Sequence, residues 1–225
     1  MSFVITTDTS ANLPTAELQW HQLELLPFSY IVNDIEHQCF DLTAFDGDAY
    51  YEMLRHTPAS TSMISMDQYR QLWEPLLQEG KDVLHVGMSS GISGAYQSAV
   101  MAARELREAY PGRRLVVFDT RAASLGEGIQ VLHAATCREA GYTLDETVRE
   151  LTELRIRQVF TVDDLMHLRR GGRVSGVAAA VGTALRIKPL LKGDEAGRIV
   201  VFAKVQGRKR SVRSLAENFA AHAEL

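Results

Sequence analysis

The chain has 225 residues, of which 46% are apolar, so it is long enough to bury one large core or two smaller ones. Its formal net charge of −4 excludes a field over the whole molecule that would attract nucleic acid or anionic lipid. The N-terminal MSFVITTD lacks the regions of a secretory signal, and no apolar run approaches the roughly 20 residues of a membrane span. We therefore expect a cytoplasmic protein that binds no nucleic acid and has no membrane span.

Four short apolar runs predict β-strands at residues 3–6, 82–87, 114–120 and 158–162. These runs are nearly continuous rather than alternating, which is typical of strands that are covered on both faces of a sheet. Helical patterns lie between them. The alternation of strand and helix predicts an α/β fold, with a parallel, doubly wound sheet in the N-terminal part of the chain.

The clearest helix is expected at 93–110, and Pro111-Gly112 ends it. Small residues dominate its apolar face, which would allow the helix to pack closely against a sheet. The residues that share this face are Ala95, Ala99, Ala102, Ala103 and Leu106. Further helices are expected at 47–56, 67–78, 125–140, 144–155 and 208–224.

Two other regions predict β-structure of a different kind. The stretch 25–34 and the pair 188–194 and 198–205 are short β segments, and the turn residues GDEAG between the last two predict a hairpin. The simplest arrangement places these segments in a mixed second sheet. We therefore expect two lobes, an N-terminal α/β lobe at 1–159 and a second mixed α/β lobe at 160–225.

The sequence contains no pattern of a metal or nucleotide site, and we expect neither a metal nor a cofactor. Cys39 and Cys137 form no CxxC pair and no Cys/His metal spacing, so they are expected to be reduced, buried thiols. The seven histidines form no HExxH motif, and His85 within a strand is interpreted as a core or edge histidine. Gly126-Glu127-Gly128 lacks the third glycine of a dinucleotide fingerprint, and no Walker A sequence is present.

The most informative feature is the Gly/Ser turn between the strand at 82–87 and the helix at 93–110. Its residues Gly87-Met88-Ser89-Ser90-Gly91 fit the G-x-S-x-G pattern of a hydrolase nucleophile elbow, so a serine hydrolase or esterase acting through Ser89 is one interpretation. That mechanism requires a carboxylate and then a histidine downstream. None of the candidates lies in a distinctive context, and no HGGG-like oxyanion loop is visible. These candidates are Asp119, Asp163 or Asp164 with His167 or His222.

The other interpretation makes the same turn an anion holder. The first N–H groups of a helix have no internal partner and carry the positive end of the dipole, so these amides and the hydroxyls of Ser90 or Ser93 are able to bind a carboxylate or phosphate. A purely structural helix cap would use the same serine.

Two more segments carry polar groups. The hydroxyl cluster at 60–65 precedes a helix, and taken alone it is interpreted as a loop in which Ser65 or Asp67 caps that helix. The segment LRRGGRVSG at 168–176 places three arginines around a Gly-Gly turn, and Arg170 or Arg173 would pair with a phosphate or with acidic groups of a partner. The alternative for this second segment is a solvated loop.

Five segments in this order resemble the DegV family of fatty-acid-binding proteins. They are TTDTSANLP (6–14), the TS-x-x-S cluster from Thr61 to Ser65, SSGISGAYQSA (89–99) with FDTRAASLGEG (118–128), LMHLRRGGRVSG (165–176) and ALRIKPLL (184–191). The resemblance implies a two-lobed α/β fold in which a long acyl chain lies in a buried tunnel and its carboxylate meets hydroxyls near the lobe junction.

The resemblance also implies a lipid-binding carrier rather than an enzyme, with a fatty acid as ligand and no further cofactor. In bacteria with the matching kinase, such proteins present the bound fatty acid for phosphorylation to acyl-phosphate, which feeds phospholipid synthesis. By position, Thr61 and Ser93 are then the first carboxylate ligands, with Ser62 and the Gly94 amide as second choices. Arg170 and Arg173 are implied in kinase contact or in closing the head-group region.

The chain departs from the family pattern in two places. Met63-Ile64 stands where family members commonly have Gln-Pro, which bears on the conformation of the loop and on acyl-chain preference. Family chains usually continue past the position of Leu225 through further strands and a His-containing, Gly-rich segment. Relative to that pattern, the second lobe is expected to be C-terminally incomplete.

Overall fold

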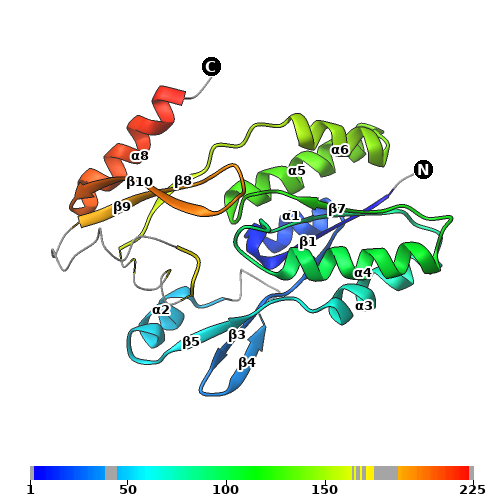
Figure 1. The fold of residues 1–225 in the computed structure, drawn as a ribbon, viewed down its shortest axis with the longest axis horizontal. Coiled ribbons are helices and arrows are strands. Elements are labelled where there is room, and N and C mark those ends of the chain that lie inside the picture. Colours follow the sequence, from blue (N-terminus) through cyan, green and yellow to red (C-terminus); the bar gives the residue numbers. More distant parts are fainter. Residues whose placement is uncertain are drawn as a thin grey trace. The chain divides into compact units, whose positions relative to one another are not determined.

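The computed structural model describes residues 3–38, 45–163, 165, 168, 171–174 and 187–222. Four residues singled out above lie outside these ranges, namely Cys39, Asp164, His167 and Arg170. The chain divides into two compact units, Met1–Arg155 and Ile156–Leu225 (Figure 1). Each unit contains both helices and strands, and no helix of the described part is long and apolar enough to cross a membrane.

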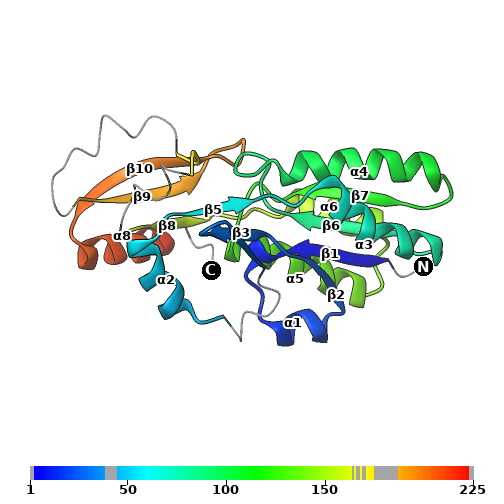
Figure 2. The same ribbon diagram turned by 90° about the horizontal axis from the view of Figure 1, so that it is seen from below.

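A four-stranded parallel sheet forms the centre of the first unit (Figure 2), and the apolar runs at 3–6, 82–87 and 114–120 predict three of its strands. The strand order is β2-β1-β6-β7, so the first strand lies between two others and is paired on both edges. The strands are β1 (Val4–Asp8), β2 (Leu23–Leu26), β6 (Val83–Gly87) and β7 (Leu115–Asp119). Their carboxyl ends lie at one edge of the sheet, where ligands bind in many α/β proteins.

Helices cover both faces of this sheet, which confirms the doubly wound arrangement. One face carries α1 (Thr15–Trp20), α5 (Leu125–Glu139) and α6 (Leu144–Glu153), and the other carries α3 (Met66–Gln78) and α4 (Ala95–Ala109). The side chains of neighbouring residues in one strand therefore pack into different core clusters. Val83 belongs to the core cluster of Trp73 and Ala99, whereas Leu84 belongs to that of Val131 and Leu151.

The alanine face predicted for the helix after β6 is buried as expected. Ala99, Ala102 and Ala103 are fully buried in α4, so the helix axis approaches the sheet closely. The helix after the hydroxyl cluster begins with a capping box between Ser65 and Gln68, which confirms the structural interpretation of Ser65. The helix α6 begins with a second capping box, formed by Thr143 and Glu146.

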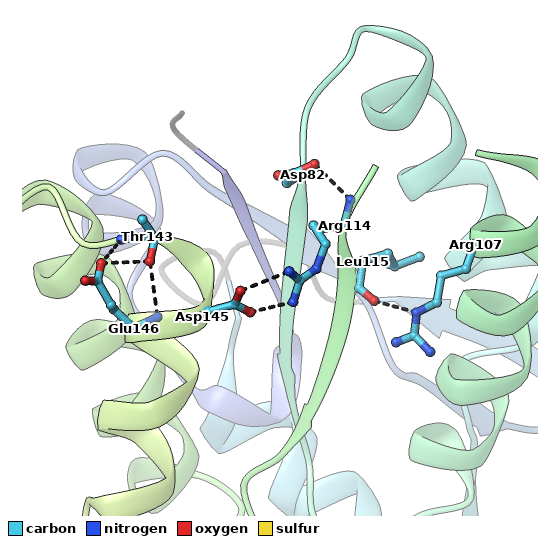
Figure 3. A network of polar contacts seen from close by, with 7 residues as sticks. All are labelled: Asp82, Arg107, Arg114, Leu115, Thr143, Asp145 and Glu146. Atoms are coloured by element: carbon cyan, nitrogen blue, oxygen red, sulfur yellow. Dashed lines mark hydrogen bonds and ion pairs between the residues drawn. The ribbon is translucent and has the colours of Figure 1, made fainter. Parts of the chain in front are cut away.

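A polar network joins two helices to the beginning of β7 (Figure 3). The Arg114 guanidinium donates hydrogen bonds to both carboxylate oxygens of Asp145 on α6, and the Arg114 backbone N–H donates to Asp82 Oδ1 over 2.8 Å. Arg107 on α4 donates from Nε to the Leu115 carbonyl over 2.7 Å. Because β7 begins at Leu115, this network lies at the opposite edge of the sheet from the strand carboxyl ends.

A second, antiparallel sheet belongs to the first unit. It contains β3 (Ser29–Val32), β4 (Ile35–Gln38) and β5 (Ala59–Ser62) in the order β4-β3-β5, and α2 (Gly47–His56) lies between β4 and β5 in the chain. The prediction of one mixed second sheet was therefore wrong for the stretch 25–34. The loop predicted around Ser60 was also wrong, because ASTS is polar, lacks alternation and gains its strand structure by pairing with β3.

In the second unit, β8 (Val159–Thr161), β9 (Ile187–Gly193) and β10 (Ile199–Gln206) form a sheet in the order β10-β9-β8. The predicted hairpin is confirmed, because β9 and β10 pair antiparallel. The strand β8 also pairs antiparallel with β9, so the apolar run at 158–162 did not indicate a parallel strand. The helix α8 (Arg208–His222) packs against these strands.

Candidate functional site

The turn that follows β6 is held from both neighbouring strands. Asp8, the last residue of β1, accepts the Met88 N–H at Oδ2 over 3.1 Å. Thr120, directly after β7, donates its hydroxyl to the Gly87 carbonyl over 2.8 Å. The Ser89 N–H donates to the Ala122 carbonyl over 2.9 Å. The backbone of the turn is therefore fixed without help from any ligand.

Ser93 lies at the end of this turn, two residues before α4 begins at Ala95. Its Oγ accepts the Ala95 N–H over 3.1 Å, and its own N–H donates to the Ser89 carbonyl over 3.1 Å. The side chain is 8% exposed, and its hydroxyl proton is not used in either bond. Gly94 forms the N-cap of α4 and supplies no side-chain cap. A carboxylate here would meet a hydroxyl at the positive end of a helix.

The other hydroxyl cluster lies on β5 and in the segment that follows it. Thr61 is exposed and pairs with Tyr30 in the antiparallel sheet. Ser62 is partly buried, and its Oγ donates a long hydrogen bond of 3.4 Å to the Met63 carbonyl. Ser65 is occupied by its capping box, so the hydroxyls of this cluster outside the cap are those of Ser60, Thr61 and Ser62.

The structure brings the two hydroxyl clusters together through Met63. A Cβ built on Gly94 would lie 2.9 Å from the Met63 sulfur, so the segment after β5 and the start of α4 are in contact. Ile64 is fully buried in the core cluster of Trp73 and anchors this segment. The departure from Gln-Pro therefore places an apolar anchor at one position and a flexible, half-exposed thioether at the other.

Ser89 lies in an arrangement that differs from a nucleophile elbow. Its side chain is 0% exposed, and its Oγ accepts the Gly91 N–H over 3.1 Å. Asp119, a candidate carboxylate for a triad, accepts hydrogen bonds from the Ser90 hydroxyl and from the Ser90 and Arg121 N–H groups. A nucleophile elbow requires an exposed hydroxyl with a base beside it, so this geometry does not favour a hydrolase.

His85 is a core histidine, as its sequence context indicates. It is 1% exposed, and its Nδ1 lies 3.0 Å from Thr6 Oγ1, which also accepts the Trp73 indole N–H over 3.1 Å. A hydroxyl oxygen has one proton and two lone pairs, so Thr6 accepts from Trp73 and still has a group for Nδ1 of either imidazole tautomer. Burial lowers the pKa of His85 to about 3, so the ring is neutral at physiological pH.

Two buried carboxyl groups lie beside the turn, and sequence reasoning did not find them. Asp8 is 1% exposed and Glu127 is 0% exposed. Burial raises the pKa of Asp8, and burial together with the nearby Asp8 raises the pKa of Glu127 well above its usual range. The neighbouring Gly128 is explained by packing rather than by nucleotide binding, because a Cβ there would lie 2.6 Å from the Ala11 carbonyl oxygen.

The remaining expected groups belong to other elements or lie outside the described residues. Arg173 belongs to the second unit, is exposed and donates to the Gly171 carbonyl. Cys137 is a free, buried thiol whose pKa is raised by burial. Within the described ranges, no group of three or more histidine, cysteine, aspartate or glutamate residues is placed to hold a metal ion.

Comparison with known proteins gives a consistent family. A family model described as "Uncharacterised protein, DegV family" matches residues 2–224. A DegV domain-containing protein from Clostridium perfringens is 36% identical over 216 residues, which cover 95% of this chain and 74% of that protein. The DegV protein of Bacillus subtilis is 30% identical over 224 residues, covering 96% of this chain and 76% of that protein.

Solved structures agree with the fold. A DegV family protein from Thermus thermophilus, described as binding fatty acid, has a TM-score of 0.86 and 30% identity, with 98% of this chain and 78% of that chain covered. A fatty-acid-binding DegV family protein from Streptococcus agalactiae has a TM-score of 0.85 and 31% identity, with 100% of this chain and 80% of that chain covered. The resemblance and the α/β fold class predicted from the sequence are therefore confirmed.

Proposed function

The chain belongs to the DegV family, and we propose that it binds a long-chain fatty acid whose carboxylate is held at the turn that carries Ser93. The relatives from Thermus thermophilus and Streptococcus agalactiae are described as fatty-acid-binding proteins, which supports this class of ligand. Thr61 and Ser93 are the proposed first ligands, with Ser62 and the Gly94 amide as second. We assign this head-group site to the N-terminal lobe, 1–159.

One observation carries the head-group proposal, namely the arrangement at the start of α4. Ser93 is nearly buried, its Oγ uses one lone pair for the Ala95 N–H, and its hydroxyl proton is left to donate. The N-cap residue Gly94 makes no side-chain hydrogen bond, and Ser93 satisfies the Ala95 N–H alone, so a carboxylate would add to the cap of this N-terminus. The contact of Met63 with Gly94 places the segment of Thr61 and Ser62 beside it.

Neutral donors suit a carrier of fatty acids. Burial of the tail contributes about 0.8 kcal/mol for each CH₂, so the head group needs orientation more than affinity. A bidentate arginine would hold the carboxylate more firmly and lower its reactivity as a nucleophile. Hydroxyl and amide donors therefore fit a carboxylate that is to be presented to another protein.

We further propose that a fatty acid kinase converts the presented carboxylate to an acyl-phosphate, while this chain contributes no catalytic residue. Arg170 and Arg173 are the proposed contacts for that kinase or for closing the head-group region. Such a role belongs in the cytoplasm, where a kinase has access to ATP. This proposal agrees with the buried state of Ser89, which does not favour chemistry by this chain.

Extraction of the purified protein tests the proposal directly. Protein purified from a bacterial host and extracted with organic solvent is expected to release a long-chain fatty acid, identified by mass spectrometry. Repeated recovery of folded, ligand-free protein that binds neither oleate nor palmitate would overturn fatty-acid binding. The kinase step is tested separately, by adding ATP and a fatty acid kinase of a DegV-containing bacterium and measuring acyl-phosphate with and without this protein.

A further inference from the structure

Asp8 and Glu127 form a buried carboxyl pair beneath the candidate site, with Ser10 between them. Asp8 Oδ1 accepts the Ser10 N–H over 2.9 Å, and the Ser10 hydroxyl donates to Glu127 Oε2. The two residues come from different elements, since Asp8 ends β1 and Glu127 lies in the first turn of α5. The other oxygen of Glu127, Oε1, and the Thr7 hydroxyl are both buried without a well-formed hydrogen bond among the described residues, although the Thr7 hydroxyl is near enough to lower the pKa of Glu127.

Among the described groups that act on this carboxyl pair, none carries a positive charge that would balance it. The titratable side chains that face it are Tyr69 from α3 and His85 from β6. Both are neutral, because burial raises the pKa of Tyr69 and lowers that of His85. Two adjacent carboxylates in such surroundings repel each other and lack solvent, so one of them retains a proton. Glu127 is the carboxyl with an oxygen that lacks a well-formed hydrogen bond, and its raised pKa agrees with that choice.

We propose that Asp8 and Glu127 share one proton and that this pair positions the turn that carries Ser93. The inference rests on the fatty-acid site proposed above and adds two positioning residues to it. Asp8 remains ionised and accepts two backbone N–H groups, whereas Glu127 is the protonated partner that neutralises the pair.

The connection from the pair to Ser93 runs through backbone hydrogen bonds. Asp8 Oδ2 holds the Met88 N–H, and Met88 is followed by Ser89. The Ser89 carbonyl accepts the N–H groups of Ile92 over 3.0 Å and Ser93 over 3.1 Å. A displacement of Asp8 therefore moves the Ser93 hydroxyl. At Gly87 the close approach is to the imidazole, because a Cβ there would lie 2.5 Å from His85 Nε2, whereas Asp8 Oδ2 lies at ordinary van der Waals distance.

Two substitutions distinguish the effect of the charge of the carboxyl pair from the effect of its shape. Glu127→Gln keeps a neutral side chain of nearly the same shape, so it is expected to hold the turn at every pH. Asp8→Asn replaces one acceptor oxygen with a donor, and one of the N–H groups of Ser10 and Met88 then has no acceptor. Glu139→Gln is the matched control, because Glu139 lies on the same helix and is half exposed.

The first experiment needs no fatty acid. The side-chain carboxyl carbon of Glu127 is followed by NMR in the ligand-free protein, and hydrogen exchange is measured at the Met88 amide. We expect Glu127 to keep its proton well above the usual glutamate range and Asp8→Asn to speed Met88 exchange by about tenfold. Titration of Glu127 at an ordinary glutamate pKa, or unchanged exchange in Asp8→Asn, would overturn the proposal.

The second experiment measures oleate affinity against pH. Wild type is expected to lose affinity relative to Glu127→Gln as pH rises, because the second charge forms only in wild type. The titration of oleate itself affects both proteins equally, so it cancels in the ratio of their affinities. The affinity of Glu139→Gln should change with pH as that of wild type does. Parallel affinity profiles of wild type and Glu127→Gln against pH would overturn the proposal. This comparison does not need Asp8→Asn, so it holds even if that variant fails to fold. If no variant binds oleate, the proposed function fails, and the carboxyl titration and amide exchange still decide the pair.

Discussion

The sulfur of Met63 lies 2.9 Å from the point that a Cβ on Gly94 would occupy. This contact joins the segment after β5 to the first turn of α4, two parts of the chain that carry the proposed ligands Thr61 and Ser93. Met63 is 53% exposed and flexible, whereas the adjacent Ile64 is fixed in the core. The thioether therefore forms an adjustable contact next to a rigid backbone.

Gly94→Ala tests this contact. The backbone at Gly94 has φ −69°, which alanine adopts without strain, so the only new cost is the collision with the Met63 sulfur. Because that side chain is free to rotate away, we expect the free energy of unfolding to fall by less than about 1 kcal/mol. The same substitution in a Met63→Ala background should have a smaller effect. Urea denaturation of the four proteins gives this double-mutant cycle, and equal costs in both backgrounds would contradict the contact.

Ser93→Ala and Thr61→Ala test the proposed carboxylate ligands. Each substitution removes one hydroxyl donor to a charged group, so oleate affinity is expected to fall by about 1.5–3 kcal/mol, with little change in the fold. Ser90→Ala is the control, since the Ser90 hydroxyl belongs to the same turn but donates to Asp119 over 2.6 Å. Calorimetric titration with oleate is the measurement. Unchanged affinity in both variants would assign the carboxylate to other groups.

The sequence predicts the parallel sheet and its helices because their signals are local. The continuous apolar runs of β6 and β7 and the alanine face of α4 follow from burial on both sides of one sheet. By contrast, β5 has no apolar pattern, and its strand structure depends on its pairing with β3. A polar tetrapeptide of this kind is not distinguishable from a loop until its partner strand is known.

The candidate site was predicted only in part, for a related reason. The Gly/Ser turn is recognisable from the sequence, because it lies between a predicted strand and a predicted helix. The choice of Thr61 as its companion came from the family resemblance, and the physical link through Met63 appears only in three dimensions. Asp8 and Glu127 gave no signal, because each resembles an ordinary acid at a helix start and their burial depends on the packing of α5 against β1.

The pH dependence of stability offers a test of His85. Its pKa in the folded protein, about 3, lies below the ordinary histidine value of 6.5, so its contribution to stability is complete above pH 6.5 and is lost as pH falls toward 3. His85→Gln keeps an acceptor for the Thr6 hydroxyl and does not titrate. We expect the difference in unfolding free energy between wild type and this variant to shrink as pH falls, by at most about 1.4 kcal/mol per pH unit. Parallel stability curves would contradict a neutral, buried His85.

The contribution of Glu127 to stability should change with pH in the opposite direction to that of His85. Its pKa in the folded protein is raised above the ordinary glutamate value of 4.5, so its contribution to stability is complete below pH 4.5 and is lost as pH rises toward the folded pKa. Glu127→Gln removes this titration, and the variant should therefore gain stability relative to wild type as pH rises from 4.5. Urea denaturation across this range provides the measurement, with Glu108→Gln, which changes an exposed glutamate of α4, as control. A constant difference between wild type and Glu127→Gln would show that Glu127 ionises in the folded protein as it does in the unfolded chain.

The last prediction concerns Ser89 and the hydrolase interpretation of its turn. The Ser89 side chain is fully buried, and its oxygen accepts the Gly91 N–H, so its lone pair is not directed at solvent. A fluorophosphonate probe is therefore expected to leave the protein unlabelled, and Ser89→Ala is expected to show the same background ester hydrolysis as wild type. Intact-protein mass spectrometry after probe treatment measures the labelling. Modification at Ser89 together with loss of ester hydrolysis in Ser89→Ala would reverse this conclusion, because it would require the turn to open and the serine to find a base.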